Sequence, residues 1–444
     1  MSAVLDEDVT EDLLRHKPAF IRRVQIRGYK SIAFCDVTLE PLTILVGRNA
    51  SGKSNFLDAL AFVRDVLDEG ANAAVVSHGG ESVFSRTADS NRMYFDLEAE
   101  FGSYGNRLFD ARYSFDLVAT NTKQVRVERE FLRLKDRLKG KICSFTVIGG
   151  KVTWAGLENF SEGFHGRLSS DNAGGQPDQG GYPSFFDNYK PDRLLLGIIG
   201  SQPFLDLAAG LRTTDRYNFI PDAIRPPRSS FGSPVLERDG SNLARAIEGL
   251  KELEEETVDR VAAYLNAIIP EIIGFDVIPI GDYETIRFKL RAPEGRSTLE
   301  LNATSMSDGT LRVLASLIAA YQVQLPEGLP GLVAIEEPES SLHPAAMNAL
   351  VDALDEATLR TQILLTTHSA EMLDNPTIQP ENIRVVQMID GETVIGPVDA
   401  ASVDIVRRQL NTLGGLERDN LLEPDLGDLQ RQQKLQRELR GSAA

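Results

Sequence analysis

One segment of the chain has the composition of a phosphate-binding loop. Residues 47–54 read GRNASGKS and match the pattern GxxxxGK[ST] between an apolar stretch, PLTILV, and an amphipathic stretch, SNFLDALAFVRDVL. Glycines let a backbone curl until its N–H groups point at phosphate oxygens, and a helix N-terminus adds partial positive charge. The candidate nucleotide-binding residues are Gly47, Arg48, Asn49, Ala50, Ser51, Gly52, Lys53, Ser54 and Asn55.

Two residues of this loop have a specific chemical role in such sites. A lysine at the position of Lys53 reaches the β- and γ-phosphates of a triphosphate, and a hydroxyl at the position of Ser54 binds Mg²⁺. An ordinary glycine-rich turn is the alternative. The strand pattern before the loop and the helix pattern after it argue against that alternative, so the segment predicts a nucleotide site.

A pair of acids closes a second apolar stretch, LVAIEE, which ends at Glu336 and Glu337. In phosphoryl-transfer sites one carboxylate joins the Mg²⁺ shell and another faces the water that attacks the γ-phosphate. By position, Glu336 is the metal-side acid and Glu337 the general base. Two acids at the end of a strand are common, so this assignment depends on the phosphate loop upstream.

Two further positions could complete the site. His368 follows the apolar stretch ILLTT and could hydrogen-bond the γ-phosphate and hold the attacking water, although a lone histidine there is more often structural. His343, in SSLHP, could simply pack a turn.

In MSDGT, Ser307 is a natural helix N-cap, and Gly309 would leave the backbone exposed at the helix start. A plain cap and a second phosphate-binding surface are both compatible with this pattern.

The elements that carry these residues alternate as in a mostly parallel α/β sheet. After residue 300 a helix, a strand, a helix, a strand and a strand pair follow one another, and strand patterns also start at residue 20. The middle of the chain contains a Gly- and Ser-rich loop, 161–183, and one helix from about 241 to 268 that Ser241 could cap. We therefore predict an N-terminal tail (1–18), two lobes of one head (19–120 and 301–400), an inserted mixed subdomain (121–300) and a C-terminal tail (401–444).

Composition limits the classes of function. The 444 residues carry a net charge of −18, which argues against indiscriminate binding to nucleic acid. Two cysteines, Cys35 and Cys143, cannot form a disulfide framework and are expected to be buried. No stretch approaches the roughly 18–20 apolar residues of a membrane span, and the first residues do not read as a secretory signal, so the expected compartment is the cytoplasm and no membrane partner is expected.

A local basic segment is the exception to this acidic balance. Residues 123–141, KQVRVEREFLRLKDRLKGK, carry eight basic and three acidic side chains. A groove for nucleic acid is one interpretation of this segment. A solvated strand or hairpin face with alternating charge is the other, and it is the more common case.

The order of these motifs resembles the RecF/SMC branch of the ATP-binding-cassette ATPases, in particular its compact AAA-type, RecF-like members. The resemblance covers about 20–120 and 300–400 through GYKS, GRNASGKS, MSDGT, VAIEEPESSLHP and LLTTHS. It implies an α/β P-loop NTPase head with a mostly parallel core sheet, an antiparallel β-rich subdomain and an inserted mixed or helical arm. It also implies ATP and Mg²⁺ as cofactors, and ATP hydrolysis as the activity.

In that family two heads pack head to tail, so the resemblance implies an ATP-dependent homodimer. Lys53, Glu337 and His368 would be catalytic, and Ser54 and Glu336 would bind the metal. Ser307 and Gly309 would touch the γ-phosphate held by the partner. Residues 339–342 would form the dimer-facing D-loop, and Arg22, Arg23 and Lys30 lie where the first strands of such heads approach nucleotide.

The sequence departs from the family pattern at several points. Glu336 replaces the usual aspartate, and the signature reads SDGT rather than SGGQ. No glutamine occupies an obvious Q-loop, for which the best positional candidate is Gly79-Gly80 in SHGGES. The insertion lacks the heptads of a long coiled-coil arm. The segment after His368 is also too short for the acid-rich nuclease domain of OLD-type relatives.

The leading hypothesis is an ATPase whose ATP-driven dimerisation acts on DNA or a DNA-bound protein, in repair or in defence against foreign DNA. An ATP-binding sensor that recruits a separate effector is the first alternative. A transport-coupling ATPase is the second, against which the RecF-like first strand and the EEPESSLHP segment argue.

Overall fold

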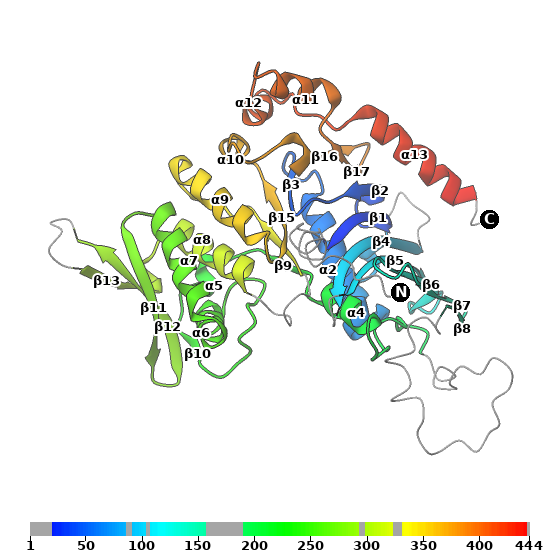
Figure 1. Ribbon diagram of the computed structural model, residues 1–444, viewed down its shortest axis with the longest axis horizontal. Coiled ribbons are helices and arrows are strands. Elements are labelled where there is room, and N and C mark those ends of the chain that lie inside the picture. Colours follow the sequence, from blue (N-terminus) through cyan, green and yellow to red (C-terminus); the bar gives the residue numbers. More distant parts are fainter. Residues whose placement is uncertain are drawn as a thin grey trace, which may run out of the picture.

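Figure 1 shows the computed structural model, which describes residues 20–85, 91–103, 107–156, 190–292, 298–322 and 331–441. The predicted tail 1–18 and loop 161–183 lie outside these ranges. No helix in the described ranges has the length and apolar character needed to cross a membrane.

The core sheet has the strand order β17-β16-β3-β15-β14-β9. Its strands β16, β3, β15, β14 and β9 run parallel, and β17 pairs antiparallel with β16. The carboxyl ends of parallel strands meet at one edge of a sheet, which is where ligands bind in such folds. The strand bounds are β3 Leu42–Val46, β9 Asp215–Tyr217, β14 Leu332–Glu336, β15 Gln362–Thr367, β16 Ile383–Ile389 and β17 Glu392–Pro397.

Both faces of this sheet are covered, as its uninterrupted apolar strands require. On β14, Leu332 and Ala334 belong to one apolar cluster, and Val333 and Ile335 belong to a second. The first cluster includes helices α2 (Lys53–Glu69), α3 (Ala71–Ser77) and α4 (Phe204–Arg212). The second includes α6 (Leu243–Leu253), α7 (Glu255–Ile268), α8 (Asp308–Tyr321) and α9 (Met347–Ala357).

An antiparallel sheet completes the first layer, with the strand order β2-β1-β4-β5-β6-β7-β8. The predicted boundary at residue 120 falls between β5 and β6 of this one sheet, so residues 125–155 continue the N-terminal lobe. Cys35 on β2 and Cys143 on β7 are both buried, as predicted. The bounds are β1 Ile21–Tyr29, β2 Ile32–Thr38, β4 Arg92–Ser103, β5 Arg107–Ala119, β6 Val125–Asp136, β7 Ile142–Ile148 and β8 Lys151–Ala155.

A third, smaller sheet packs beside α6 and α7, visible at the left of Figure 1. Its strand β12 pairs with β10, β11 and β13, all antiparallel. The short helix α5 (Pro221–Ile224) connects β9 to this region. The strand bounds are β10 Arg228–Ser229, β11 Ile272–Ile280, β12 Tyr283–Arg291 and β13 Thr298–Asn302.

The single helix predicted from about 241 to 268 is wrong, because the chain breaks into α6 and α7. Glu254 adopts an extended conformation, with φ −154° and ψ 83°, and its carboxylate accepts hydrogen bonds from Arg360 at 2.7 and 3.1 Å. The cap prediction is also wrong, because Asn242 precedes α6 and the Ser241 hydroxyl donates to Glu237 instead. Tertiary packing overrides the helical pattern here.

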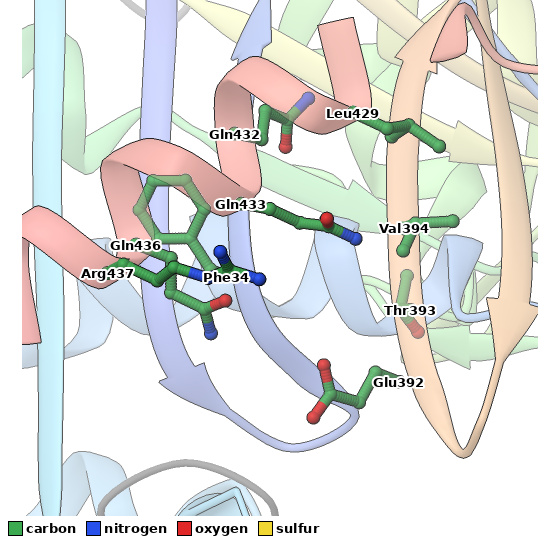
Figure 2. Close-up of a pocket in the computed structure, with 9 residues that line it drawn as sticks. All are labelled: Phe34, Glu392, Thr393, Val394, Leu429, Gln432, Gln433, Gln436 and Arg437. Carbon is green, nitrogen blue, oxygen red and sulfur yellow. The ribbon is translucent and has the colours of Figure 1, made fainter. Parts of the chain in front are cut away.

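The C-terminal segment is helical and docks on the sheets. It forms α10 (Ala370–Leu373), α11 (Ala400–Arg407), α12 (Leu413–Arg418) and α13 (Leu426–Gly441). The buried Gln432 on α13 accepts from the Asp36 N–H at 3.1 Å and donates to the Ile395 carbonyl at 2.9 Å, which ties β2 to β17. A cavity of about 320 Å³ remains between α13 and these strands, and Figure 2 shows Phe34, Thr393 and Gln433 around it.

Candidate functional site

The phosphate loop follows β3 and enters α2, and its glycines are required by close contacts. A Cβ on Gly52, whose φ is 106°, would lie 1.9 Å from the Thr393 hydroxyl oxygen. A Cβ on Gly47 would lie 2.0 Å from the Val386 carbonyl oxygen. The strand pair β16–β17 therefore presses against the back of the loop, and the Thr393 hydroxyl also donates to the Ser51 carbonyl at 3.0 Å.

The loop has the features of an anion cradle. Helix α2 begins at Lys53 after the N-cap residue Gly52, which offers no side-chain cap, so the first N–H groups of the helix stay available. The Ser51 hydroxyl oxygen is buried and has no hydrogen-bond partner among the described residues. Residues 48–50 are exposed. These donors fit the phosphate groups of a nucleotide, as the sequence predicts.

Lys53 and His368 meet at the centre of the site. The Lys53 ammonium donates to the carbonyls of Gly47 at 2.7 Å and Arg48 at 3.2 Å, and it lies 2.9 Å from Nε2 of His368. Burial lowers the pKa of Lys53 from its ordinary value. Burial and the charge of Lys53 also lower the pKa of His368, so its imidazole is neutral at pH 7 and can accept a hydrogen bond.

Glu336 and Glu337 lie beside these groups at the end of β14. The Ser54 hydroxyl donates to Oε2 of Glu336 at 2.6 Å, so the two predicted metal ligands are in direct contact. The Oε1 atom of Glu337 lies 3.3 Å from Nε2 of His368, and Ser340 donates to the other Glu337 oxygen at 3.1 Å. The structure thus brings together the P-loop, both acids and His368.

The backbone at Glu337 is strained. Its φ of 43° is in the left-handed region, which costs a residue with a Cβ of the order of 1 kcal/mol. The Glu337 N–H donates to the Thr366 carbonyl at 3.1 Å and to the Thr366 hydroxyl at 3.2 Å, which holds the residue there. Such strain at a residue with a predicted catalytic role is typical of functional sites.

The predicted D-loop needs a correction at its first residue. Glu339 does not face the surface, because its carboxylate is buried beneath Thr367 and His368. One oxygen accepts from the Thr367 hydroxyl and from the His368 N–H at 3.4 Å, and the other has no partner among the described residues. Burial raises the pKa of Glu339. Glu339 therefore supports the His368 backbone, whereas Ser341 two residues later is exposed.

The predicted signature segment starts α8. Ser307 is its N-cap and accepts from the Thr310 N–H at 3.2 Å. The expectation that Gly309 bares the backbone is wrong, because Gly309 is buried and a Cβ there would lie 2.5 Å from the Ser341 carbonyl oxygen. Arg225 pairs with Asp308 and donates to the Met306 carbonyl at 3.2 Å. The hydrogen bonds of Ser307 stay within its own helix start, so its contact with a partner remains a prediction.

Three other residues that the sequence analysis considered make contacts away from the phosphate loop. Arg22 pairs with Glu100, and Arg23 pairs with Asp36 and Glu98 on the antiparallel sheet, so neither points at the phosphate loop. His343 is exposed and caps its own turn by accepting from the Ala345 N–H at 3.2 Å, which matches the turn-packing alternative.

Lys30 lies at a cavity of about 410 Å³ and pairs with Asp58 of α2, the helix that follows the phosphate loop. Lys30, Ser31, His78 and Gly391 are among the residues that line this cavity. Asn55 of α2 donates to the Ser31 hydroxyl at 2.6 Å, which connects the cavity wall to the helix that follows the phosphate loop. The Q-loop candidate, Gly79-Gly80, directly follows His78.

Sequence reasoning missed three charged residues of this site. Arg216 on β9 contacts Glu336, and Asp58 on α2 contacts Arg216. Glu417 on α12 belongs to the electrostatic surroundings of Lys53, and burial raises its pKa. The i, i+4 spacing of Ser54 and Asp58 was the available signal for Asp58. The short segments that carry Arg216 and Glu417 gave no such signal.

A buried histidine gives the site region a pH dependence. His78 lies between Asp58 and Asp65, with its ring nitrogens 3.1 and 2.7 Å from their carboxylates. Burial alone would lower its pKa, but the hydrogen bonds and charges of these two acids raise it above the ordinary value of 6.5. The stability from this contact is therefore full below about pH 6.5 and is lost as the pH rises through the raised pKa.

We expect His78→Gln to lower the free energy of unfolding by about 2 kcal/mol at about pH 6, because two buried carboxylates lose a cationic partner. The difference from wild type should shrink as the pH rises through the raised pKa of His78. Denaturant unfolding at several pH values measures this. His343→Gln on the exposed turn is the matched control. A loss for His78→Gln that does not change with pH would contradict a charged His78.

Comparison with known proteins agrees with this geometry. The family described as "AAA domain, putative AbiEii toxin, Type IV TA system" matches residues 42–147 and 154–374, which is more than half of the chain. A search of curated proteins found no match.

Several solved structures share similarity over most of their length. An SMC head bound to the C-winged helix domain of ScpA is 14% identical, with 86% of this chain and 99% of that chain covered and a TM-score of 0.46. The SMC head domain from Thermotoga maritima is 12% identical, with 86% and 100% covered and a TM-score of 0.39. An Smc head domain with an extended coiled coil, bound to the C-terminal domain of ScpA derived from Pyrococcus furiosus, is 14% identical, with 88% and 99% covered and a TM-score of 0.45.

The predicted P-loop fold of head type is confirmed by the sheet order and by the family match. A single edge of the core sheet carries the phosphate loop, the two acids and His368, and the family match spans all of them. The chain therefore belongs to the AAA-domain family described as "putative AbiEii toxin, Type IV TA system".

Proposed function

We propose that this protein binds ATP with Mg²⁺ and hydrolyses it, and that two copies close head to tail over the nucleotide. The observation that carries the proposal is the contact chain at the sheet edge. Ser54 donates to Glu336 at 2.6 Å, and His368 lies 2.9 Å from Lys53 and 3.3 Å from Glu337. One cluster thus supplies a phosphate-binding cation, a metal-binding pair and a candidate base.

Each residue of the site has a separate role in the proposed hydrolysis of ATP. Backbone N–H groups of the loop and Lys53 hold the phosphates, and Lys53 can exchange its contacts with the Gly47 and Arg48 carbonyls for phosphate oxygens. Ser54 and Glu336 would hold Mg²⁺, which neutralises phosphate charge when bound. Glu337 accepts a proton from the attacking water, and the neutral His368 holds that water in line. We assign the 410 Å³ cavity beside Ser31 to the nucleoside.

Closure by a second copy is supported by the position of the signature segment. Ser307 is exposed at the N-terminus of α8, where helix N–H groups and the macrodipole favour an anion. Its hydrogen bonds do not extend to the phosphate loop of its own chain. The phosphate that Ser307 would touch therefore belongs to a partner in this proposal.

The test of the central claim uses the full chain. Steady-state ATP hydrolysis should depend on Mg²⁺, and the measured mass should double when a non-hydrolysable ATP analogue is added. Failure to bind nucleotide in a direct titration would contradict the proposed function. If the protein hydrolyses ATP but stays monomeric at every nucleotide concentration, the proposed activity stands and the proposed closure of two copies is contradicted.

DNA, or a protein bound to it, is the proposed target of the closed dimer. Most of the basic segment 123–141 forms β6, whose basic side chains are exposed, whereas Glu130 and Asp136 are buried. Arg112 on β5 lies directly opposite Arg133. Acids interleave them, because Asp110 lies opposite Lys135 and Asp116 opposite Arg129. The face is therefore one of alternating charge. Arg112 pairs with Asp96, so the use of this face as a DNA site rests on the exposed Arg133 and Lys135.

We expect the double variant Arg133→Glu and Lys135→Glu to weaken binding of duplex DNA by about tenfold at low salt, because two phosphate contacts are lost and repulsion is added. Gel shifts over a salt series measure this. The double variant Lys434→Glu and Arg437→Glu, at two exposed positions of α13, serves as the charge-matched control. Equal DNA affinity for the wild type and the double variant would remove β6 as the contact surface.

A further inference from the structure

Arg216 connects the two elements that would bind the metal. It lies on β9, opposite Ala334 of the neighbouring parallel strand β14. Its Nε donates to Oε1 of Glu336 at 2.6 Å, and its Nη1 donates to Oδ1 of Asp58 at 2.8 Å. One guanidinium therefore bridges the end of β14 and helix α2, and its side chain is 26% exposed, so solvent screens the pair only partly.

The two oxygens of Glu336 have different partners. Oε2 accepts from the Ser54 hydroxyl at 2.6 Å, and Oε1 accepts from Arg216. A glutamate has one more rotatable bond than an aspartate, so its carboxylate loses more conformational entropy when it is fixed at one point. The planar guanidinium holds one oxygen in place and leaves the oxygen on the Ser54 side directed at the metal position.

Asp58 supplies a negative charge beside Arg216, which lies next to the proposed Mg²⁺ ligand Glu336. A cation bonded to a metal ligand would repel Mg²⁺ if nothing balanced it. Asp58 lies four residues after Ser54 on α2, so both project from the same face of the helix. Hydrogen bonds from His78 and Lys30 keep the pKa of Asp58 far below the usual range, so Asp58 stays charged and gives Arg216 an anionic partner.

Asp58 itself is held firmly. The Tyr29 hydroxyl donates to it at 2.6 Å, Lys30 pairs with it, and His78 lies 3.1 Å away. Arg216 is thus anchored on a carboxylate whose position is fixed by three other side chains. Partners of metal ligands that are held in this way typically change metal affinity by roughly 10–100-fold when they are removed.

We propose that Arg216 is a positioning residue that fixes the Glu336 carboxylate for Mg²⁺ and so adapts a glutamate to a place where an aspartate is usual. The inference rests on the proposed function, because it assumes that Ser54 and Glu336 take Mg²⁺ with a nucleotide. It assigns no contact between Arg216 and the nucleotide itself.

The test separates metal binding from nucleotide binding. A fluorescent, non-hydrolysable ATP analogue is titrated into the full chain in EDTA, and Mg²⁺ is then titrated into the complex. For Arg216→Gln the affinity in EDTA should equal that of wild type, whereas the Mg²⁺ concentration at half-effect should rise about tenfold or more. Arg216→Lys keeps the charge but cannot bridge both acids in the same way, so it should fall between the two.

Control variants guard against a simple folding defect. Arg212→Gln removes an arginine of similar exposure that pairs with Asp68, and its Mg²⁺ dependence should stay that of wild type. Asp58→Asn removes the other end of the bridge and should raise the Mg²⁺ requirement in the same direction as Arg216→Gln. Thermal unfolding confirms that each variant is folded before titration.

A double-mutant comparison addresses the role of the longer side chain. In a Glu336→Asp background the shorter carboxylate no longer reaches Arg216 in the same way, so Arg216→Gln should cost less than in wild type. An equal cost in both backgrounds would contradict the proposed adaptation to glutamate.

The outcomes distinguish the inference from the function beneath it. Tighter Mg²⁺ binding by Arg216→Gln would show that Arg216 competes with the metal, and an unchanged Mg²⁺ requirement would show that it has no positioning role. Either result overturns the inference while the proposed function stands. Wild-type protein that binds no nucleotide, with or without Mg²⁺, would overturn both.

Discussion

Replacement of Lys53 by alanine should reduce ATP turnover by at least about 100-fold, the loss typical when one preorganised charge-stabilising group is removed. Lys53 is buried in the loop and is bonded to the Gly47 and Arg48 carbonyls and to His368, so its ammonium is already positioned for phosphate oxygens. Nucleotide affinity should fall as well, because the lysine contacts the ground state. Initial rates of phosphate release and a nucleotide titration measure the two effects.

The variant should remain folded. Burial lowers the pKa of Lys53, which shows that the folded state disfavours its charge, so alanine removes a cost together with its hydrogen bonds. Lys434→Ala on exposed α13 is the matched control and should keep wild-type turnover. Equal hydrolysis by wild type and Lys53→Ala would assign the activity to another site or to a contaminant.

Replacement of Glu337 by glutamine should lower turnover by about 100-fold or more while ATP binding persists. Glutamine keeps the shape of the side chain and its contact with Ser340, but it cannot accept the proton of the attacking water. ATP then stays intact in the site, and a dimer that closes over it should accumulate. Mass measurement with ATP and Mg²⁺ should show a dimer for Glu337→Gln and a shorter-lived one for wild type.

Two results would oppose this prediction. Wild-type turnover by Glu337→Gln would exclude Glu337 as the base. A monomer that holds ATP at high protein concentration would exclude closure over nucleotide. Glu438→Gln on α13 is a control for the change of charge, because its carboxylate is exposed and lies far along the chain from the site.

A mixing experiment tests whether the signature acts across the dimer. Ser307→Arg should block contact with a partner's phosphate, so each of Lys53→Ala and Ser307→Arg is inactive alone. A mixed dimer contains one site with an intact loop and an intact signature, so mixing should restore part of the turnover. If Ser307 acts within its own chain, the mixture stays inactive.

The local sequence predicted the phosphate site because its chemistry depends on neighbours along the chain. The loop, its preceding strand and helix α2 lie where the pattern placed them, and Phe56, Leu57 and Leu60 form part of the buried face of the amphipathic helix α2. Strand β14 ends at Glu336 and strand β15 ends at Thr367, where the two apolar stretches of the sequence also end. Each of these elements was predicted from an apolar stretch and the polar residue that ends it, and both are visible in the local sequence.

The errors arose where distant segments decide the conformation. At the break, Glu254 contacts Arg360, which is more than one hundred residues away in the sequence, and helical periodicity continues across it. Gly309 reads as an open helix start, yet the Ser341 carbonyl covers it. The family resemblance placed Glu339 at the start of a dimer-facing loop, yet Thr367 and His368 close over its carboxylate.

The sequence by itself determined the phosphate loop, the acid pair, the order of strands and helices after residue 300 and the charge of the chain. Each of these depends on residue types at short spacing along the chain. Only the tertiary structure decided that Arg216, on a strand of three residues, bridges Glu336 and Asp58. It also decided that the antiparallel sheet continues past residue 120 and that α13 ties β2 to β17. Contacts between segments far apart in sequence depend on how sheets stack and which helices cover them, and spacing along one chain does not encode that.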